Sequence, residues 1–227
     1  MSKNSNRSNS KINDALYNIG RNKKIRSKFI NFLKNSEKHL SHKGSKRDEI
    51  IGPIVDALHN DNDTYTKLIS GGLKIKFFYR SKIAREFLLS NSKKPSHIWE
   101  PQTTKLLLYL SKNLYDDVLI GGAYFGDQAI LISKNIYSRS GTVHCFEPNE
   151  EQNKMLNNNI KINHIKNIKV NKYGLWSQSK KRLKLVGYDS FANSILAPYS
   201  KNGFQTITID EYCITKKKKF RINSFRY

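Results

Sequence analysis

The sequence predicts an α/β fold with a Rossmann-like parallel sheet, and three observations support this. Short apolar strand patterns alternate with helical patterns from residue 117 onward, which implies right-handed crossovers between parallel strands. A glycine-rich turn, within VLIGGAYFGDQAIL (118–131), joins the first of these strands to the first helix. The second strand ends at the acid Glu147, at the edge of the sheet where such folds bind ligands.

The alternation defines the elements of this sheet. Strands are expected over 117–120, 142–147 and 167–176, and helices over 127–137 and 149–160. Asn149 is expected to cap the second helix, with Gln152 three residues later as in a capping box. Two further strand patterns follow at 182–188 and 204–210, and no crossover helix is evident between them.

The chain before this sheet shows helical patterns and one hairpin. Apolar residues at helical spacing predict helices over 14–40, 47–60, 81–90 and 101–114. TYTKLISGGLKIKFFY (64–79) predicts two strands around a Gly-Gly turn. The last of these helices begins at Pro101, which suits a first helical turn, and its leucines are expected to form one stripe: Leu106, Leu107, Leu110 and Leu114.

These patterns divide the chain into four parts. Residues 1–46 form a basic, polar and helical extension, partly disordered because 1–12 contain too few apolar residues to fold alone. Residues 47–100 form a lead-in of helix and hairpin, residues 101–212 carry the sheet, and residues 213–227 form a basic tail.

Length and cysteine content limit the class of protein. The 227 residues suffice for one sizeable core or two small ones. No apolar run approaches the ~20 residues of a membrane-spanning helix, and the polar N-terminus gives no secretory signal. Cys145 and Cys213 lie too far apart for a metal motif and form no disulfide framework, so a reducing, cytoplasmic location and no metal are expected.

The net charge of +23 has two interpretations. A basic face would bind nucleic acid or an anionic surface, whereas lysines solvated along the whole chain would have no partner. Lysine is spread throughout, with short runs such as 216–219, and no RNA-binding signature with interleaved aromatic residues is present. The distribution favours solvated lysines and leaves a non-enzymatic basic module, for RNA or an anionic surface, as the alternative function.

The turn at 121–128 narrows the class of ligand. A phosphate-binding P-loop ends in Gly-Lys-Ser/Thr, whereas this turn ends in Gly126-Asp127-Gln128, which excludes that class. In the dinucleotide frame G-x-G-x-x-G, Ala123 stands where a pyrophosphate would come closest, and Asp127 would repel it. S-adenosylmethionine carries no phosphate and has a cationic sulfonium and amine, so it tolerates this acid.

Glu147 adds a second indication of a nucleoside. It follows Gly126 by 21 positions and ends the second strand, where a carboxylate can accept hydrogen bonds from both ribose hydroxyls. The turn and the acid together favour S-adenosylmethionine. An NAD-dependent oxidoreductase remains the second alternative.

The segments GGAYFGD, FEPNEEQNKMLNNNIKIN and TITID, in this order, resemble the FkbM-type methyltransferases. The resemblance covers roughly residues 77–212 and includes the lead-in WEPQTTKLLLYL. It implies a class I methyltransferase sheet, S-adenosylmethionine as cofactor, and methyl transfer to a small-molecule, sugar or glycan hydroxyl. It also implies contacts to the methionine part from Gly122, Ala123, Tyr124 and Gly126, to the ribose from Glu147, and near the adenine from Pro148 and Asn149.

Two departures from the family pattern follow. The family's turn usually carries an acid at the position of Ile120, near the amine of the ligand, and here Asp127 or Glu100 would have to supply that charge. After TID the family continues with a strand of the pattern Lys-x-Asp-x-Glu-Gly, whereas this chain reads EYCITKKKKFRINSFRY.

The second departure leads us to expect a truncated or frameshifted methyltransferase without the C-terminal half of its sheet, with a natural short form completed by a partner as the alternative. Its first strand would be an open edge through which copies of the chain could pair into a homo-oligomer. The acceptor pocket would be incomplete and the chain inactive alone. No catalytic base is assigned, and Asp210 is interpreted as a strand-end cap.

Overall fold

The structure is a computed structural model that describes residues 3–94, 98–187, 193–217 and 220–225. The chain forms two compact units. The N-terminal unit comprises Met1–Tyr65 and Phe78–Asn91, and the sheet unit comprises Thr66–Phe77 and Ser92–Tyr227. Among the described residues, no helix combines the length and the apolar character needed to cross a bilayer.

The N-terminal unit is mainly helical, as its sequence patterns predict. Its helices are α1 (Lys3–Arg21), α2 (Lys23–Ser36), the 3₁₀-helix η1 (Glu37–His39), the π-helix η2 (Arg47–Ile51), α3 (Gly52–Ala57) and α4 (Lys82–Leu89). Asn22 caps α2 through its side chain, and Ser81 caps α4 in the same way. The helices enclose a core that includes Ile30, Leu33, Ile51, Val55, Leu58 and Leu89. α1 begins at Lys3, earlier than the apolar pattern predicts.

The predicted hairpin is confirmed. β1 (Thr64–Leu68) and β2 (Lys74–Phe78) form a two-stranded sheet, and the 3₁₀-turn η3 (Ser70–Gly72) joins them. Gly71 and Gly72 have φ values of 75° and 74°, a left-handed conformation that glycine adopts without steric cost.

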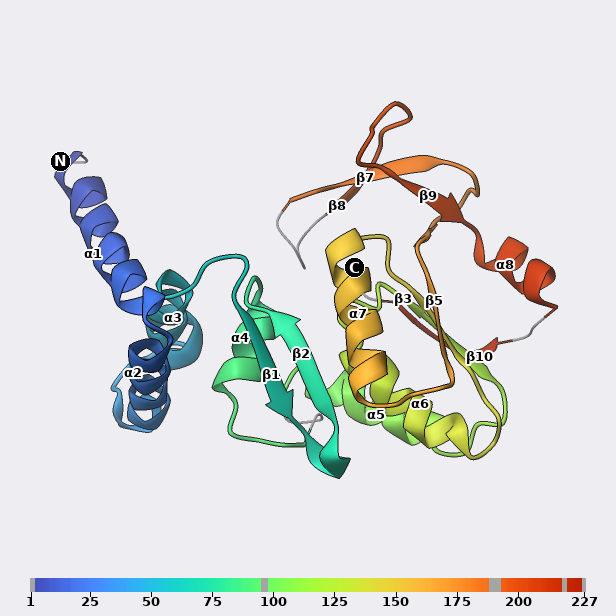
Figure 1. The fold of residues 1–227 in the computed structure, drawn as a ribbon, viewed down its shortest axis with the longest axis horizontal. Helices are drawn as coiled ribbons and strands as arrows, with labels where there is room; N and C mark the ends of the chain where they lie inside the picture. The colour runs from blue at the N-terminus through green and yellow to red at the C-terminus, as the bar shows by residue number, and fades with distance from the viewer. Residues whose placement is uncertain (1–2, 95–97, 188–192, 218–219, 226–227) are drawn as a thin grey trace. The chain divides into compact units, whose positions relative to one another are not determined.

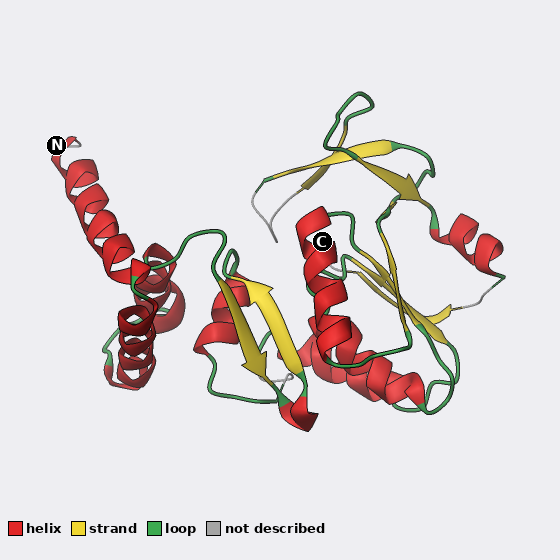
Figure 2. Ribbon diagram, viewed as in Figure 1, coloured by secondary structure: helices red, strands yellow, loops and turns green. Residues whose placement is uncertain are grey.

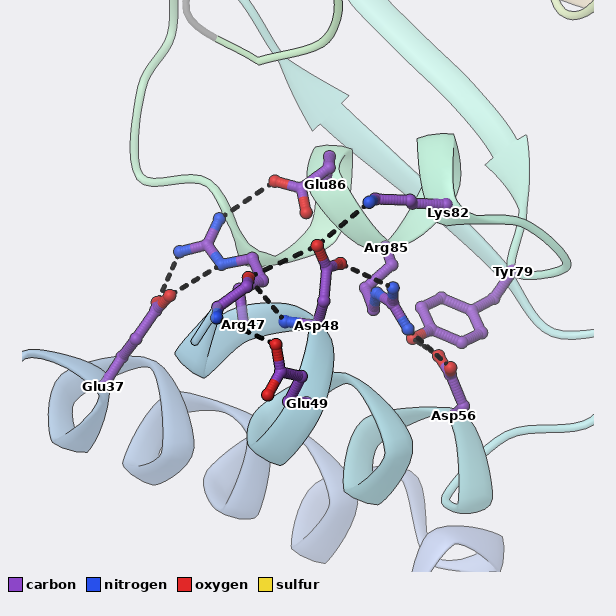
Figure 3. A network of polar contacts seen from close by, with 10 residues as sticks. Glu37, Arg47, Asp48, Glu49, Asp56, Tyr79, Lys82, Arg85 and Glu86 are labelled. Atoms are coloured by element: carbon purple, nitrogen blue, oxygen red, sulfur yellow. Dashed lines mark hydrogen bonds and ion pairs between the residues drawn. The ribbon is translucent and has the colours of Figure 1, made fainter. Parts of the chain in front are cut away.

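Ion pairs connect the helices of the N-terminal unit (Figure 3). Arg47 bonds to Glu37 and lies 3.1 Å from Glu86. Arg85 lies 3.0 Å from Asp48 and 2.7 Å from Asp56. These contacts connect η2, α3 and α4. Each charged side chain in them has an oppositely charged partner within the unit.

His59 lies in the core of the same unit. Its ring stacks on Tyr79 at a centroid distance of 3.8 Å, and its two nitrogens lie 2.6 Å from the carbonyl of Val55 and 2.6 Å from the hydroxyl of Tyr65. Burial disfavours the charged imidazolium and lowers the pKa of His59 from 6.5 to about 4, although the Val55 carbonyl opposes the shift. The folded unit therefore holds His59 neutral near pH 7.

This depressed pKa predicts that the N-terminal unit loses stability in acid. Between about pH 6.5 and pH 4 the unfolded chain binds more protons at His59 than the folded chain, so the free energy of unfolding falls as the pH drops through this window. We expect this group to contribute a loss of about 2–3 kcal/mol. Urea unfolding followed by far-UV circular dichroism measures it. His59→Gln, which does not titrate, should lose this part of the slope, and equal slopes would contradict the assignment.

The sheet unit contains a four-stranded parallel sheet in the order β10-β3-β4-β5 (Figure 1). Its strands are β3 (Asp117–Gly121), β4 (Val143–Phe146), β5 (Ile168–Asn171) and β10 (Phe220–Phe225). The predicted α/β class is thus confirmed, and the helices expected before and between the strands are present as α5 (Pro101–Ser111), α6 (Asp127–Tyr137) and α7 (Glu150–Ile162) (Figure 2).

Opposite faces of this sheet pack against different elements. Val118 and Ile120 of β3 share a core with Leu107 of α5, Ile132 of α6 and Leu156 of α7. Leu119 points to the other face because side chains alternate along a strand. There it packs with Phe146 and with Tyr212 of α8 (Ile209–Lys216). The glycine-rich turn therefore follows a strand that is buried on both faces.

The expectation that the first strand is an open edge is wrong. β10 pairs with β3 from Phe220↔Asp117 to Phe225↔Gly121, so β3 is an inner strand. A fourth strand is therefore present, within the segment interpreted as a basic tail. The side chains of β3 are fully buried, and such a strand needs partners on both sides for its backbone N–H and C=O groups. Pairing of copies through β3 has no basis in this sheet.

The C-terminal strands differ from the predicted pattern in two further ways. The strand expected over 167–176 is divided into β5 and β6 (Gly174–Leu175), which belong to different sheets. β6 joins a second sheet with β9 (Phe204–Ile207), β7 (Arg182–Val186) and β8 (Asn193–Leu196), in the order β6-β9-β7-β8. β9 ends at Ile207 because Thr208 caps α8 through its side chain, so Asp210 lies in the first turn of a helix and not at a strand end.

The predicted leucine stripe of α5 is only partly buried. Leu107 is buried, whereas Leu106 and Leu110 are exposed by 56% and 43%. The buried positions are Thr104, Leu107 and Ser111, a stripe with the same helical spacing that includes two polar residues. The hydroxyls of Thr104 and Ser111 donate hydrogen bonds to nearby backbone carbonyls. These bonds allow the two polar side chains to be buried.

Candidate functional site

The turn after β3 has an unusual backbone conformation. Gly122, Tyr124 and Gly126 have φ values of 66°, 52° and 88°. Left-handed geometry is uncommon for a bulky residue such as Tyr124 and persists only where the surroundings enforce it. Here the N–H of Ala123 donates to the carbonyl of Phe146 at 3.1 Å, and the N–H of Gly126 donates to the carbonyl of Ala123 at 2.9 Å. The turn is therefore held against the end of β4.

Gly126 cannot carry a side chain in this turn. A Cβ atom would lie 2.4 Å from Cδ1 of Leu156, a residue of α7 that is fully buried in the core of the sheet. The left-handed φ adds a second penalty for any other residue. Gly126 precedes the first residue of α6, so its small size lets this helix start directly at the turn.

Glu147 connects the turn to the end of β4. Its side chain is buried, with Oε2 accepting the N–H of Tyr124 at 2.8 Å and Oε1 accepting the N–H of Asn149 at 2.9 Å. The two carboxylate oxygens thus accept N–H groups from two different segments. The predicted ribose acid is thus fixed in place by backbone groups from both sides of the site.

Asn149 has the local role that the sequence predicts. Its side chain accepts the N–H groups of Glu151 and Gln152 at 3.0 Å each and so caps α7. Because its own N–H holds Glu147, the cap also fixes the orientation of that carboxylate. Pro148, half-exposed, lies between these two residues in the chain.

The two acids proposed for the positive part of the ligand lie at the start of α6. Asp127 is its first residue and is buried, where the helix N-terminus favours a negative charge. Glu100, with φ 40°, precedes α5, and its Oε2 lies 3.4 Å from Nε2 of Gln128 in the first turn of α6. Ile120, at the family's acidic position, is buried in the core of the sheet.

Tyr124 contributes its backbone to the site, while its ring packs in the core. The ring is buried and lies 4.7 Å from the ring of Phe125, which in turn lies 5.8 Å from that of Phe77. This packing supports a core role for the side chain. The N–H that Tyr124 donates to Glu147 is its contribution to the site.

A buried polar cluster on the other face of the sheet was not predicted. His144 bonds to the hydroxyl of Tyr212 at 2.6 Å and to Oδ2 of Asp117 at 3.2 Å, and Oδ1 of Asp117 accepts the N–H of Thr142 at 2.9 Å. All three side chains of this cluster are buried. The only sequence signal was a histidine inside the apolar strand TVHCF, because its partners lie 27 and 68 positions away.

Comparisons with known proteins found no family model and no curated protein that matches this chain. Solved structures with a similar arrangement include a SAM-dependent O-methyltransferase from Thermotoga maritima, with 14% sequence identity, a TM-score of 0.32, and coverage of 57% of this chain and 48% of that chain. A protein-L-isoaspartate O-methyltransferase matches with 15% identity, a TM-score of 0.27, and coverage of 64% and 41%. The chain spans less than half the length of either structure.

Proposed function

We propose that the sheet unit binds S-adenosylmethionine at the turn after β3 and acts in methyl transfer to a hydroxyl group. The observation that carries the proposal is Glu147, buried at the end of β4 and oriented by the N–H groups of Tyr124 and Asn149. A carboxylate at this place in such a sheet can accept hydrogen bonds from two adjacent ribose hydroxyls.

The acids at the start of α6 favour this ligand over a dinucleotide. In dinucleotide-binding sheets the pyrophosphate lies at the N-terminus of the first helix. Here Asp127 begins that helix with a carboxylate, and Glu100 lies beside its first turn. Two negative groups repel a pyrophosphate and attract a cationic amine or sulfonium.

The residues present therefore fit the cofactor in distinct roles. Glu147 would hold the ribose, the backbone of 122–126 would lie along the methionine part, and Glu100 or Asp127 would balance the positive charge. S-adenosylmethionine, when bound, supplies an activated methyl group on its sulfonium. The protein's part is to orient the cofactor and to exclude water, since orientation accounts for much of the barrier that such reactions overcome.

The acceptor is proposed as a sugar or another small or glycan-linked hydroxyl, in the manner of the FkbM-type enzymes. This part of the proposal depends on the ordered segments GGAYFGD, FEPN and TID. A cytoplasmic location is proposed on the two cysteines, both of which are free thiols, with Cys145 buried.

Calorimetric titration of the purified chain with S-adenosylmethionine and with NAD tests the proposal. We expect S-adenosylmethionine to bind at least about tenfold more tightly, which corresponds to about 1.4 kcal/mol. S-adenosylhomocysteine, which shares the ribose and the amine, serves as the positive control for the site. A preference for NAD would replace the proposal with the oxidoreductase alternative.

A further inference from the structure

The positive charge of the N-terminal unit is concentrated in two helices. Residues 3–36, which form α1 and α2, contain nine lysines and arginines and one acid, Asp14. The remaining parts of the unit, 37–65 and 78–91, contain seven basic and seven acidic residues. Several of the latter pair with one another in the network of Figure 3. The excess of eight positive charges therefore belongs to α1 and α2 alone.

α2 carries a second apolar stripe, of which only Phe29 packs against the core. Its inner stripe, with Ile30 and Leu33, is buried in the core. Ile25, Phe29 and Phe32 recur at spacings of four and three residues and so share another face of the helix. Ile25 and Phe32 are exposed by 50% and 61%, and the rings of Phe29 and Phe32 stack at 6.4 Å. A helix packed on a core needs only one apolar stripe.

Exposed basic residues border this outer stripe. Lys28 lies three residues after Ile25 and four before Phe32, which places it beside both on the helix surface, and Arg21 is the exposed last residue of α1. Lys24 is also exposed. Long basic side chains can lay their methylene stems along apolar surface while their charged ends reach outward. The stripe and its border thus combine apolar and cationic groups on one surface.

We infer that this surface of α2, with α1 beside it in sequence, binds to an anionic lipid bilayer. Ile25 and Phe32 would enter the boundary between headgroups and acyl chains, and Arg21, Lys24 and Lys28 would lie among the lipid phosphates. A second copy of the chain is a poor occupant, because two strongly basic surfaces repel each other.

A nucleic acid would also attract the basic residues of this surface. It would leave the aliphatic side chain of Ile25 without a matching partner, since phosphate contacts come from basic and polar groups and base stacking comes from aromatic rings. The exposed isoleucines of α1, Ile12 and Ile19, lie seven residues apart and extend the aliphatic character of this pair of helices. A lipid bilayer is therefore the partner that would contact both the apolar and the basic residues of this surface.

Flotation of the purified full chain with lipid vesicles tests the inference. We expect binding to phosphatidylcholine vesicles that contain about one third phosphatidylserine, and little binding to phosphatidylcholine alone. The double variant Ile25→Ser, Phe32→Ser should bind at least about tenfold more weakly, because the inserted apolar area is lost. Both side chains are exposed, so thermal unfolding should stay unchanged and confirm that the variant folds.

The matched control is Leu106→Ser, Tyr109→Ser on α5, which removes two residues exposed by 56% and 76% from a helix whose only basic residue is Lys105. This variant should bind vesicles as the unmodified chain does. Absence of binding to anionic vesicles, equal binding to phosphatidylcholine, or an equal loss in the control would overturn the inference. The inference would also be overturned if a single-stranded RNA oligomer displaced the vesicles and if its own affinity fell by the same factor in the Ile25→Ser, Phe32→Ser variant.

Discussion

Asp117→Ala should lower the free energy of unfolding of the sheet unit by about 3–5 kcal/mol. The carboxylate of Asp117 lies 3.2 Å from Nε2 of His144 and accepts the N–H of Thr142 at 2.9 Å. The side chains of Asp117 and His144 are buried, so removal of the carboxylate leaves the ring of His144 without this bond in an apolar setting. The effect should be among the largest that a single truncation produces in this chain.

Chemical denaturation followed by tryptophan fluorescence measures this loss. The two tryptophans, Trp99 and Trp176, both belong to the sheet unit, so the signal reports that unit. Asp117→Asn is the matched control. It keeps a side-chain oxygen for Thr142 and should lose distinctly less stability than Asp117→Ala. A loss below about 1 kcal/mol in the alanine variant would show that His144 and Thr142 find other partners.

Glu147→Ala should abolish detectable cofactor binding and weaken the turn. The buried N–H group of Tyr124 and the part-buried N–H group of Asn149 lose their acceptor, at a cost of about 1–3 kcal/mol for the buried one and less for the other. The ribose loses its proposed acceptor at the same time, which adds a further factor of about ten or more in affinity. Calorimetry with S-adenosylmethionine and fluorescence-detected unfolding separate the two effects.

Two variants make the result for Glu147 specific. Glu147→Gln keeps one carbonyl oxygen for a backbone N–H, so it should retain more of the stability than Glu147→Ala while it still weakens the binding. Glu150→Ala removes an acid three positions further on, whose carboxylate is exposed and pairs with Lys154, and it should change neither quantity. A folded Glu147→Ala variant with unchanged affinity would remove Glu147 from the site.

The proposed lipid-binding surface of α1 and α2 bears on where the proposed methyl transfer would take place. If α1 and α2 bind an anionic bilayer, methyl transfer would take place at a membrane surface, and acceptors displayed there would be favoured. The cofactor site and the lipid surface belong to different units of the chain, so each can fail its test without affecting the other.

The local features of the sheet and the turn could be predicted from the sequence. The alternation of strand and helix from 117 to 162 follows from the spacing of apolar residues, which can be recognised within each short segment. Gly126 was recognised as a turn residue and Asn149 as a cap because these roles involve only neighbouring residues. Glu147 was found for the same reason, since it ends a strand whose pattern is plain in the sequence.

The tertiary structure alone decided the features that depend on distant pairing. β10 directly follows a lysine run and mixes apolar and polar residues without a regular alternation, so only its pairing with β3 defines it. The burial of His144, the exposure of Leu106 and the division of 167–176 between two sheets likewise depend on elements far away in the chain. The physical reason is that side-chain burial and sheet pairing are set by the partners that the fold brings together, whereas turns, caps and periodicity are properties of the local chain.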